Sequence, residues 1–271
     1  MFPTFESLTV MHWTRSAAMI STFCLLSGVV TAQPPNALAV FNGADSATVV
    51  APVSIASAFG KQVGASTVAG SLPLTTTLGG VSLNVTDSAN VARMAPLFYV
   101  SPNQINFVIP EGTAPGMATV TITNGDATKP TTTVQVAPVA PGLFTANSQG
   151  VGVAAAIAIR RIIATQTDDP VPVFHCDAAG CASDPIDLDT ASNVFLELFG
   201  TGIRGRTSLA NVSATIGGIS VKVLFADAQG QFPGLDQVNL ALPLTLQGKG
   251  ETDVVLTVEG QVANKVRVNI H

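Results

Sequence analysis

The residues best suited to metal or acid–base chemistry lie in one stretch of the chain. Six aspartates fall between positions 168 and 189. Oxygen ligands on extracellular loops can bind Ca²⁺, so Asp184, Asp187 and Asp189, the most closely spaced, are the candidate calcium ligands. The Asp-x-Asp-x-Asp-Gly pattern of a calcium loop is absent. A solvated acidic linker is therefore the favoured interpretation, and calcium is the only cofactor that we consider.

Two cysteines occupy the same stretch. Cys176 and Cys181 are five residues apart. Such a pair tends to oxidise outside the cytoplasm, so we predict a disulfide that closes a local loop. Chain entropy assigns about 2 kcal/mol to so short a loop. A metal site formed by both thiolates and His175 is the alternative, but it lacks a fourth ligand at a recognised spacing.

Residues for hydrolytic catalysis are scarce. A serine triad would have to use His175 or His271, and no Gly-x-Ser-x-Gly elbow is present. Glu197 is a candidate glycosidase acid. Strand alternation would place it with Phe195 and Phe199 on the outer face of a sheet, which predicts a surface carboxylate instead. We therefore predict that the protein is not an enzyme and has no catalytic residues.

Two amide pairs could bind a polar ligand. Gln104 and Asn106 are two residues apart, as are Gln237 and Asn239. The two-residue period of a strand puts both amides of a pair on one face. We expect them to hydrogen-bond backbone groups between strand and loop. Aromatic platforms for sugars are few, since Tyr99 is the only tyrosine and Trp13 the only tryptophan.

Short strands must position these residues. Gly and Pro recur about every ten residues, and β-branched runs lie between them. No convincing amphipathic helix appears, and we predict a strand over 154–164. The predicted strands are 81–85, 105–109, 118–123, 131–136, 194–199, 219–224, 254–258 and 266–270. This spacing predicts an all-β fold of antiparallel sandwiches.

An internal repeat organises the strands. Four landmarks occur twice in the same order, at offsets of about 133 to 140 residues. They are Phe59-Gly60 and Phe199-Gly200, Leu78-Gly79-Gly80-Val81 and Ile216-Gly217-Gly218-Ile219, Gln104-Ile105-Asn106 and Gln237-Val238-Asn239, and 118–122 and 254–258. The paired glycines suit a bulge or a close approach at a strand start. Pro110 and Pro243 each end a strand.

The repeat predicts two tandem immunoglobulin-like antiparallel β-sandwiches. We place the first at 38–145 and the second at 190–271. Between them we expect an irregular acidic connector, residues 146–189, that carries the cysteine loop.

The N-terminal segment has the pattern of a secretory signal peptide. Ser16–Val30 is apolar, Arg15 precedes it, and Val30-Thr31-Ala32 offers small residues for cleavage. We expect residues 1–32 to be removed after Ala32 and the protein to be secreted or held at the cell surface. No later stretch predicts a membrane span.

Charge narrows the partners further. Hydrophobic residues make up 47% of the chain and charged residues 11%, and the net charge is −5. This composition supports a packed core and excludes a disordered tail. An acidic chain without a basic stripe is not expected to bind nucleic acid.

The landmarks resemble a known family. The matching residues are 72–74, 78–81, 95–106, 114–116 and 140–144 in the first half and 185–188, 198–204 and 234–239 in the second. They are similar to the uncharacterised C-terminal domain of many secreted acidobacterial proteins. Each half also resembles an IPT/TIG-type immunoglobulin-like domain. The resemblance implies an extracellular β-sandwich module without an established activity, so no catalytic residues carry over.

These observations together predict a secreted, non-catalytic adhesion or interaction module. Its partner would be an extracellular protein or a polysaccharide. A polysaccharide-binding accessory protein is the alternative, and a secreted hydrolase is less favoured.

Overall fold

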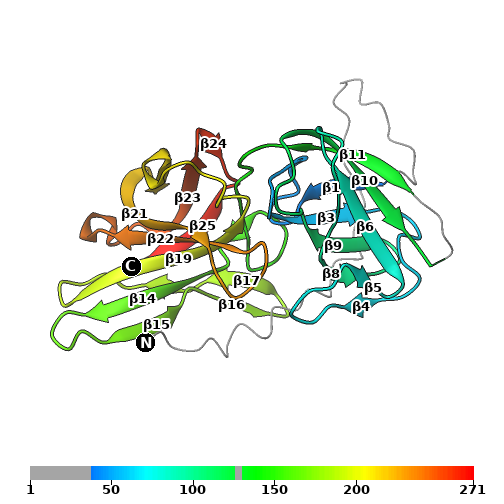
Figure 1. Cartoon of the computed structure of the whole chain (residues 1–271). Coiled ribbons are helices and arrows are strands. Elements are labelled where there is room, and N and C mark those ends of the chain that lie inside the picture. The colour runs from blue at the N-terminus through cyan, green and yellow to red at the C-terminus, as the bar shows by residue number, and fades with distance from the viewer. Residues whose placement is uncertain (1–37, 126–129) are drawn as a thin grey trace, which may run out of the picture. The chain divides into compact units, whose positions relative to one another are not determined.

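The computed structural model describes residues 38–125 and 130–271, and these form an all-β fold (Figure 1). The predicted class of tandem antiparallel sandwiches is confirmed. The expected signal peptide, residues 1–32, lies outside the described residues. Within the described part of the chain, no helix has the length and hydropathy needed to cross a bilayer.

The first sandwich has two sheets. One sheet has the strand order β1-β3-β9-β8-β4 and the other β2-β11-β10-β6-β5, with β7 paired to β6. Their bounds are β1 Ala39–Asn42, β2 Val49–Val50, β3 Ile55–Phe59, β4 Val68–Ala69, β5 Thr77–Leu78, β6 Val81–Thr86, β7 Ala92–Met94, β8 Leu97–Val100, β9 Gln104–Val108, β10 Gly116–Thr123 and β11 Thr131–Val136. Alternate residues such as Val81, Leu83 and Val85 point inward and are buried. The alternation read from the sequence therefore forms the core of this sandwich.

The second sandwich is one continuous sheet that folds over on itself. Its strand order is β13-β25-β23-β20-β21-β22-β19-β14-β15. Strand β21, Ile219–Ala228, belongs to both layers, because it pairs first with β20 and then with β22. The other bounds are β12 Gly142–Leu143, β13 Gly152–Val153, β14 Ala156–Ile162, β15 Asp168–Pro172, β18 Pro185–Ile186, β19 Ser192–Thr201, β20 Val212–Ile216, β22 Asp236–Leu242, β23 Gly250–Val258, β24 Gln261–Val262 and β25 Val266–Ile270.

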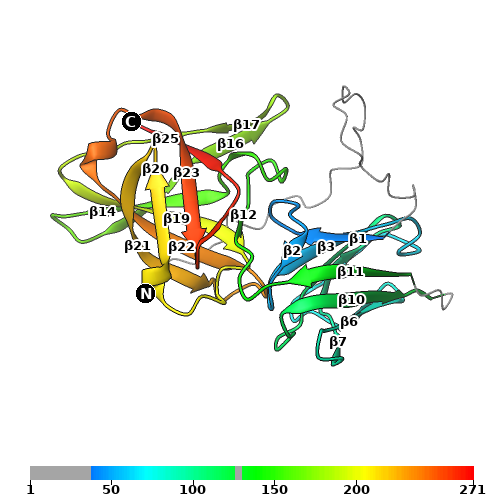
Figure 2. The same ribbon diagram turned by 90° about the horizontal axis from the view of Figure 1, so that it is seen from above.

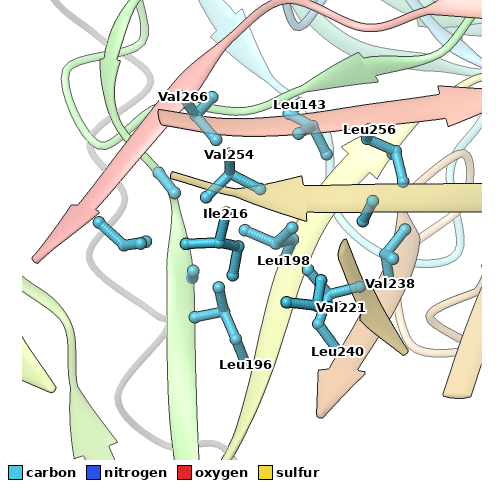
Figure 3. Close-up of a cluster of buried hydrophobic side chains, with 14 of the residues drawn as sticks. Leu143, Leu196, Leu198, Ile216, Val221, Val238, Leu240, Val254, Leu256 and Val266 are labelled. Carbon is cyan, nitrogen blue, oxygen red and sulfur yellow. The ribbon is translucent and has the colours of Figure 1, made fainter. Parts of the chain in front are cut away.

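The core of the second sandwich is aliphatic. Leu196 and Leu198 from β19 meet Val238 and Leu240 from β22 and Leu256 from β23, all essentially without exposed surface (Figure 3). Burial of each such side chain contributes about 1.5–3 kcal/mol. These residues alternate with polar or aromatic ones, so their burial fixes which side chains of β19 and β22 face outward.

The expected connector over 146–189 requires correction. Strands β13, β14, β15 and β18 lie there, and each is part of the sheet of the second sandwich. Figure 2 shows β14 among its strands. Pairing with the second sandwich begins earlier still, because β12 pairs with β19. The strand predicted over 154–164 is confirmed as β14. Its partner β19 begins thirty residues later, so a local reading of composition could not detect this pairing.

The two sandwiches share much of their topology. The order β1-β3-β9-β8 in the first matches β14-β19-β22-β21 in the second. Strand β2 pairs in parallel with β11, as β18 does with β25. The strand that precedes Pro110 ends at Val108, and the one that precedes Pro243 ends at Leu242, as predicted. The repeat read from the sequence is thus a repeat of strand pairing.

The Gly-Gly landmarks have a different role from the expected bulge. Gly79 and Gly80 have φ values of 58° and 78°, and Gly217 and Gly218 have 55° and 79°. Each pair forms a two-residue hairpin turn, for which positive φ at both positions favours glycine. The strand after the turn, β6, joins β10 in the first sandwich. In the second sandwich it is the strand before the turn, β20, that joins β23.

One buried carboxylate holds the first sandwich together at its β6–β7 turn. Asp87 is 4% exposed. It accepts hydrogen bonds from the backbone N–H groups of Ala114, Val91 and Ala89 and from Arg93 at 2.6 Å. These bonds, the one from Ala114 first, lower the pKa of Asp87 to about 2. The turn is thereby tied to a segment 27 residues away.

We predict that Asp87→Asn lowers the free energy of unfolding at neutral pH. The amide would set an NH₂ group against donors that now face a carboxylate oxygen. Because the folded pKa is depressed below 3.8, the contribution of the charge is present above pH 3.8 and is lost as the pH falls toward about 2. Urea unfolding measured across this pH range should show that the difference in free energy of unfolding between variant and wild type becomes smaller as the pH falls. Asp177→Asn, on an exposed hairpin, is the control, and its free energy of unfolding should equal that of the wild type across the range.

Candidate functional site

The predicted disulfide is present. Cys176 and Cys181 are bonded, with an S–S distance of 2.05 Å. They lie directly opposite each other on β16, Phe174–Asp177, and β17, Gly180–Ser183. The expected loop is therefore a two-stranded hairpin. Next to it, His175 Nδ1 lies 2.6 Å from Asp184 Oδ1, a contact across the base of the hairpin.

The candidate calcium ligands have separate partners. Asp184 contacts His175, and Asp187 Oδ1 lies 3.0 Å from Nδ1 of His271. Asp189 contacts Arg160 at 2.9 Å and accepts from the Ser192 hydroxyl. Among the described residues, no three His, Cys, Asp or Glu side chains are grouped so that they could hold a metal ion. The geometry thus provides no common ligand shell for these three aspartates.

The amide pairs hydrogen-bond within themselves. Gln104 Nε2 donates to Asn106 Oδ1 at 2.8 Å, and Gln237 Nε2 donates to Asn239 Oδ1 at 2.8 Å. The prediction that each pair shares one face is confirmed. Bonds from these side chains to backbone were expected, but each glutamine amide donates instead to the asparagine of its own pair. Both pairs lie on the outer face, since Ile105 and Val238 between them are buried in the cores.

A bulge sets an aromatic ring beside each asparagine. Tyr99 lies opposite Asn106, and Phe225 lies opposite Asn239. In both sandwiches the register shifts by one residue just before this ring, at Phe98 and at Leu224. The sequence analysis missed this feature. Its only signal is an extra apolar residue in 97–100 and 223–226, where strict alternation fails.

The second sandwich presents an outer surface around Glu197. We call it the Glu197 face. One row of directly opposed residues crosses five strands, from Pro172 through Ile157, Glu197 and Asn239 to Phe225. The next row holds Pro170, Ile159, Phe195 and Ala241 and ends at Lys222. All of these side chains are partly or largely exposed, and Phe225 is 38% exposed. The face is therefore mainly apolar, with the Glu197 carboxylate near its centre and Lys222 at the end of its second row.

Glu197 lies on the outer face, as predicted, and has few partners. Its Oε1 accepts from Asn239 Nδ2 at 3.3 Å. No ion pair joins it to any cation of the described residues. The nearby Arg161 is held by Asp168 through two bonds of 2.7 Å and lies over the Phe195 ring. Partial burial, and then the charge of Asp168, raise the pKa of Glu197.

The corresponding surface of the first sandwich is covered. Ser57 takes the place of Glu197 and donates to Asn106 at 2.9 Å. Ser57 is 7% exposed, Asn106 is 2% exposed and Ile55 is 4% exposed. The backbone N–H of Ile55 donates to Thr201 Oγ1 at 2.8 Å. The same face thus packs against protein in one copy of the repeat.

Glycine allows this close approach. A Cβ atom on Gly234 would lie 2.8 Å from Cγ1 of Ile55, and its φ is 77°. Thr201 also donates to the carbonyl of Gly234 at 2.7 Å. The contact on Ile55 is therefore made by Thr201 and Gly234 together.

A fully buried aspartate shapes the loop after Thr201. Asp236 accepts from the backbone N–H of Ile203 at 2.7 Å and from Nε of Arg204 at 2.5 Å. Burial raises the pKa of Asp236, although Arg204 opposes that shift. These bonds fix the loop over 201–206 and leave no free group for chemistry.

A shallow polar hollow lies on the outer side of β20, β23 and β25. It is lined by Glu251, Asp253, Lys265 and Arg267 among others. Lys265 contacts Asp253 at 3.1 Å, and Arg267 lies 3.8 Å from both Glu251 and Asp253. The charges there neutralise one another, so this hollow offers a ligand less than the Glu197 face does.

Comparison with known proteins finds similarity to solved structures. No protein-family model matches the chain, and no curated protein matches it. Among solved structures, the chain is similar to the titin Ig tandem domains A164–A165, with 10% sequence identity and a TM-score of 0.22. That match covers 87% of this chain and 96% of the titin chain. At this TM-score it supports no statement about function.

We predict that Glu197→Gln raises the free energy of unfolding at neutral pH. A carboxyl whose folded pKa is raised above 4.5 contributes most stability below pH 4.5, and that contribution is lost as the pH rises through the folded pKa. Glutamine keeps an acceptor for Asn239 but carries no charge to desolvate. Thermal unfolding at pH 7 should therefore show a higher melting temperature for the variant. Equal melting temperatures at pH 7 would contradict the burial of this charge, and Glu111→Gln, on an exposed turn, is the control.

Proposed function

We propose that this protein is a secreted, non-catalytic interaction module that binds its partner through the Glu197 face. The observation that carries the proposal is the contrast between the two copies of this face. In the first sandwich Ile55, Ser57 and Asn106 are buried, and Thr201 and Gly234 contact Ile55. In the second sandwich the matching Phe195, Glu197 and Asn239 are partly exposed.

The composition of the Glu197 face supports binding. Apolar side chains such as Ile157, Ile159 and Phe225 surround a single carboxylate. Interface cores are enriched in aromatic and aliphatic residues and depleted in charge, and one desolvated charge can set specificity. The amides of Gln237 and Asn239 supply hydrogen-bonding groups at the rim of this patch.

The arrangement around Glu197 supports a role without catalysis. A glycosidase needs a second carboxylate that is free to act as acid or base. The nearest candidate is Asp168, and both of its oxygens are bound by Arg161. Neither histidine belongs to this face, because His175 and His271 contact Asp184 and Asp187.

One observation favours a polysaccharide as the partner. The Phe225 ring lies opposite Asn239, beside Gln237, and rings next to amides can bind a sugar by stacking and hydrogen bonding. Phenylalanine lacks the polar atom that tyrosine and tryptophan present to sugars. We therefore place a protein partner first and a polysaccharide second.

The test compares two exposed apolar residues. We expect Phe225→Asp to reduce binding of the labelled secreted protein to the surface of its parent cells at least tenfold, because the charge would lie within the Glu197 face. Met117→Asp is the matched control, since Met117 is also exposed but lies on the first sandwich. Binding is measured by flow cytometry, with protease-treated cells and insoluble cellulose and chitin alongside.

Each result has a distinct meaning. Loss of binding after protease treatment supports a protein partner, and retention on cellulose or chitin supports the polysaccharide alternative. Equal binding of Phe225→Asp and wild type would contradict the assignment of this face. Substrate turnover that Glu197→Gln abolishes would contradict the non-catalytic role.

A further inference from the structure

One three-residue pattern recurs in the chain. Aspartate is followed by serine or threonine three times, and alanine is the next residue each time. The three triads are Asp45-Ser46-Ala47, Asp87-Ser88-Ala89 and Asp189-Thr190-Ala191. They lie in the β1–β2 turn, in the β6–β7 turn and just before β19. The same triad therefore occurs in both sandwiches, at sites that are distant in the sequence.

All three triads have the same local hydrogen bond. Oδ1 of the aspartate accepts from the backbone N–H of the alanine, at 2.9 Å for Asp45, 3.0 Å for Asp87 and 2.9 Å for Asp189. Aspartate commonly closes a turn by bonding the backbone two residues further on. The residue between the two bonded groups is exposed in each triad. An exposed serine or threonine thus lies in the middle of each turn.

The turn itself does not require a hydroxyl residue in the middle. Asp177 Oδ1 accepts from the backbone N–H of Ala179 at 2.7 Å, and the residue between them is Ala178. Ala178 is exposed, like the middle residue of each triad. The bond that closes the turn therefore forms equally well with alanine, so it does not explain the serine or threonine of the three triads.

The three hydroxyl groups differ in how free they are. Among the described residues, the hydroxyls of Ser46 and Thr190 make no hydrogen bond. The Ser88 hydroxyl donates to the carbonyl of Pro115 at 2.6 Å. Ser46 has a φ of 62°, in the left-handed region. Thr190 has neither a bond to break nor a left-handed backbone, so its hydroxyl is the one most available for reaction.

The charge beside each hydroxyl selects the class of group that it can carry. A phosphate next to an aspartate is disfavoured, because the two negative charges repel each other. A neutral sugar meets no such repulsion. Sugars attached to proteins are bulky and solubilising and lie at the surface, where these exposed turns also lie.

We propose that the three triads are O-glycosylation sites, with Thr190 as the principal acceptor. The hydroxyl oxygen attacks the anomeric carbon of a sugar that is carried on a phosphate group. The bond between that carbon and the phosphate oxygen breaks, and the phosphate leaves with the electron pair. The hydroxyl proton passes to a base of the transferase, and nothing is oxidised or reduced. No triad lies in the two rows of the Glu197 face, so the modification is independent of the face proposed for binding.

Peptide mass spectrometry tests the sites directly. The protein is purified from its parent cells, digested, and sequenced by electron-transfer fragmentation, which leaves sugars attached. We expect the mass of one or more hexose or N-acetylhexosamine units on Thr190, with lower occupancy at Ser46 and Ser88. The exposed Ser66 and Thr67 follow no aspartate and are the internal controls.

Three results would overturn the inference. They are an unmodified Thr190, the mass of a phosphate on Thr190 in place of a sugar, and sugars that are as frequent on Ser66 and Thr67 as on the triads. Thr190→Ala, a substitution at an exposed position, should remove the sugar from its peptide and leave the circular dichroism spectrum unchanged.

A gained site gives the sharper test of the triad. Ala178→Ser completes an Asp-Ser-Ala triad on the turn that Asp177 already closes. We expect this variant, produced in the parent cells, to carry a sugar at position 178 and to lose it when Asp177→Ala is added. Ala182→Ser is the matched control, because Ala182 is exposed on the same hairpin but follows Cys181. Sugar on both single variants, or on neither, would contradict recognition of the triad.

The place of modification identifies the sugar donor. Deletion of residues 1–32 should keep the chain in the cytoplasm, where nucleotide sugars are the donors. Modification of this shortened chain at Thr190 would assign a nucleotide sugar. Modification of the exported chain alone would assign a sugar carried on a lipid phosphate. Both results support glycosylation of Thr190, whereas sugar on neither chain contradicts it.

Discussion

Alternation along β19 and β22 is the constraint on which the rest of this structure depends. Leu196, Leu198, Val238 and Leu240 must enter the core, and this burial forces Glu197 and Asn239 to the opposite face. A register slip of one residue in either strand would bury polar side chains and expose the core ones. Such a slip is strongly unfavourable. The position of the charge is thus a consequence of where the leucines lie.

The internal repeat contains two versions of one surface. Both have a bulge, a ring opposite an asparagine, and a glutamine that donates to that asparagine. Their differences include Ile55 against Phe195 and Ser57 against Glu197. Ile55 and Ser57 are buried, whereas Phe195 and Glu197 are partly exposed. The two faces therefore have different environments.

Local patterns predicted much of this fold. The all-β class, the cysteine pair, the strand over 154–164 and the outward position of Glu197 all follow from alternation or short spacing. The bulges at Phe98 and Leu224 depend on register with a distant strand, which no local pattern encodes. The same limit explains the connector: Asp168 and Pro170 read as linker residues, although pairing with β14 makes them an edge strand.

The energetics of Glu197 agree with the proposed role of this residue in binding a partner. A half-buried carboxylate without a cation is less favourable in the folded state than a neutral side chain would be. Ser57 shows that the fold accepts such a neutral residue at the matching position, where it hydrogen-bonds the equivalent asparagine. Functional sites commonly retain groups that lower stability because binding requires them. A cation of the partner would interact with the Glu197 carboxylate, which has lost part of its hydration. The free energy of this interaction would contribute to the affinity for the partner.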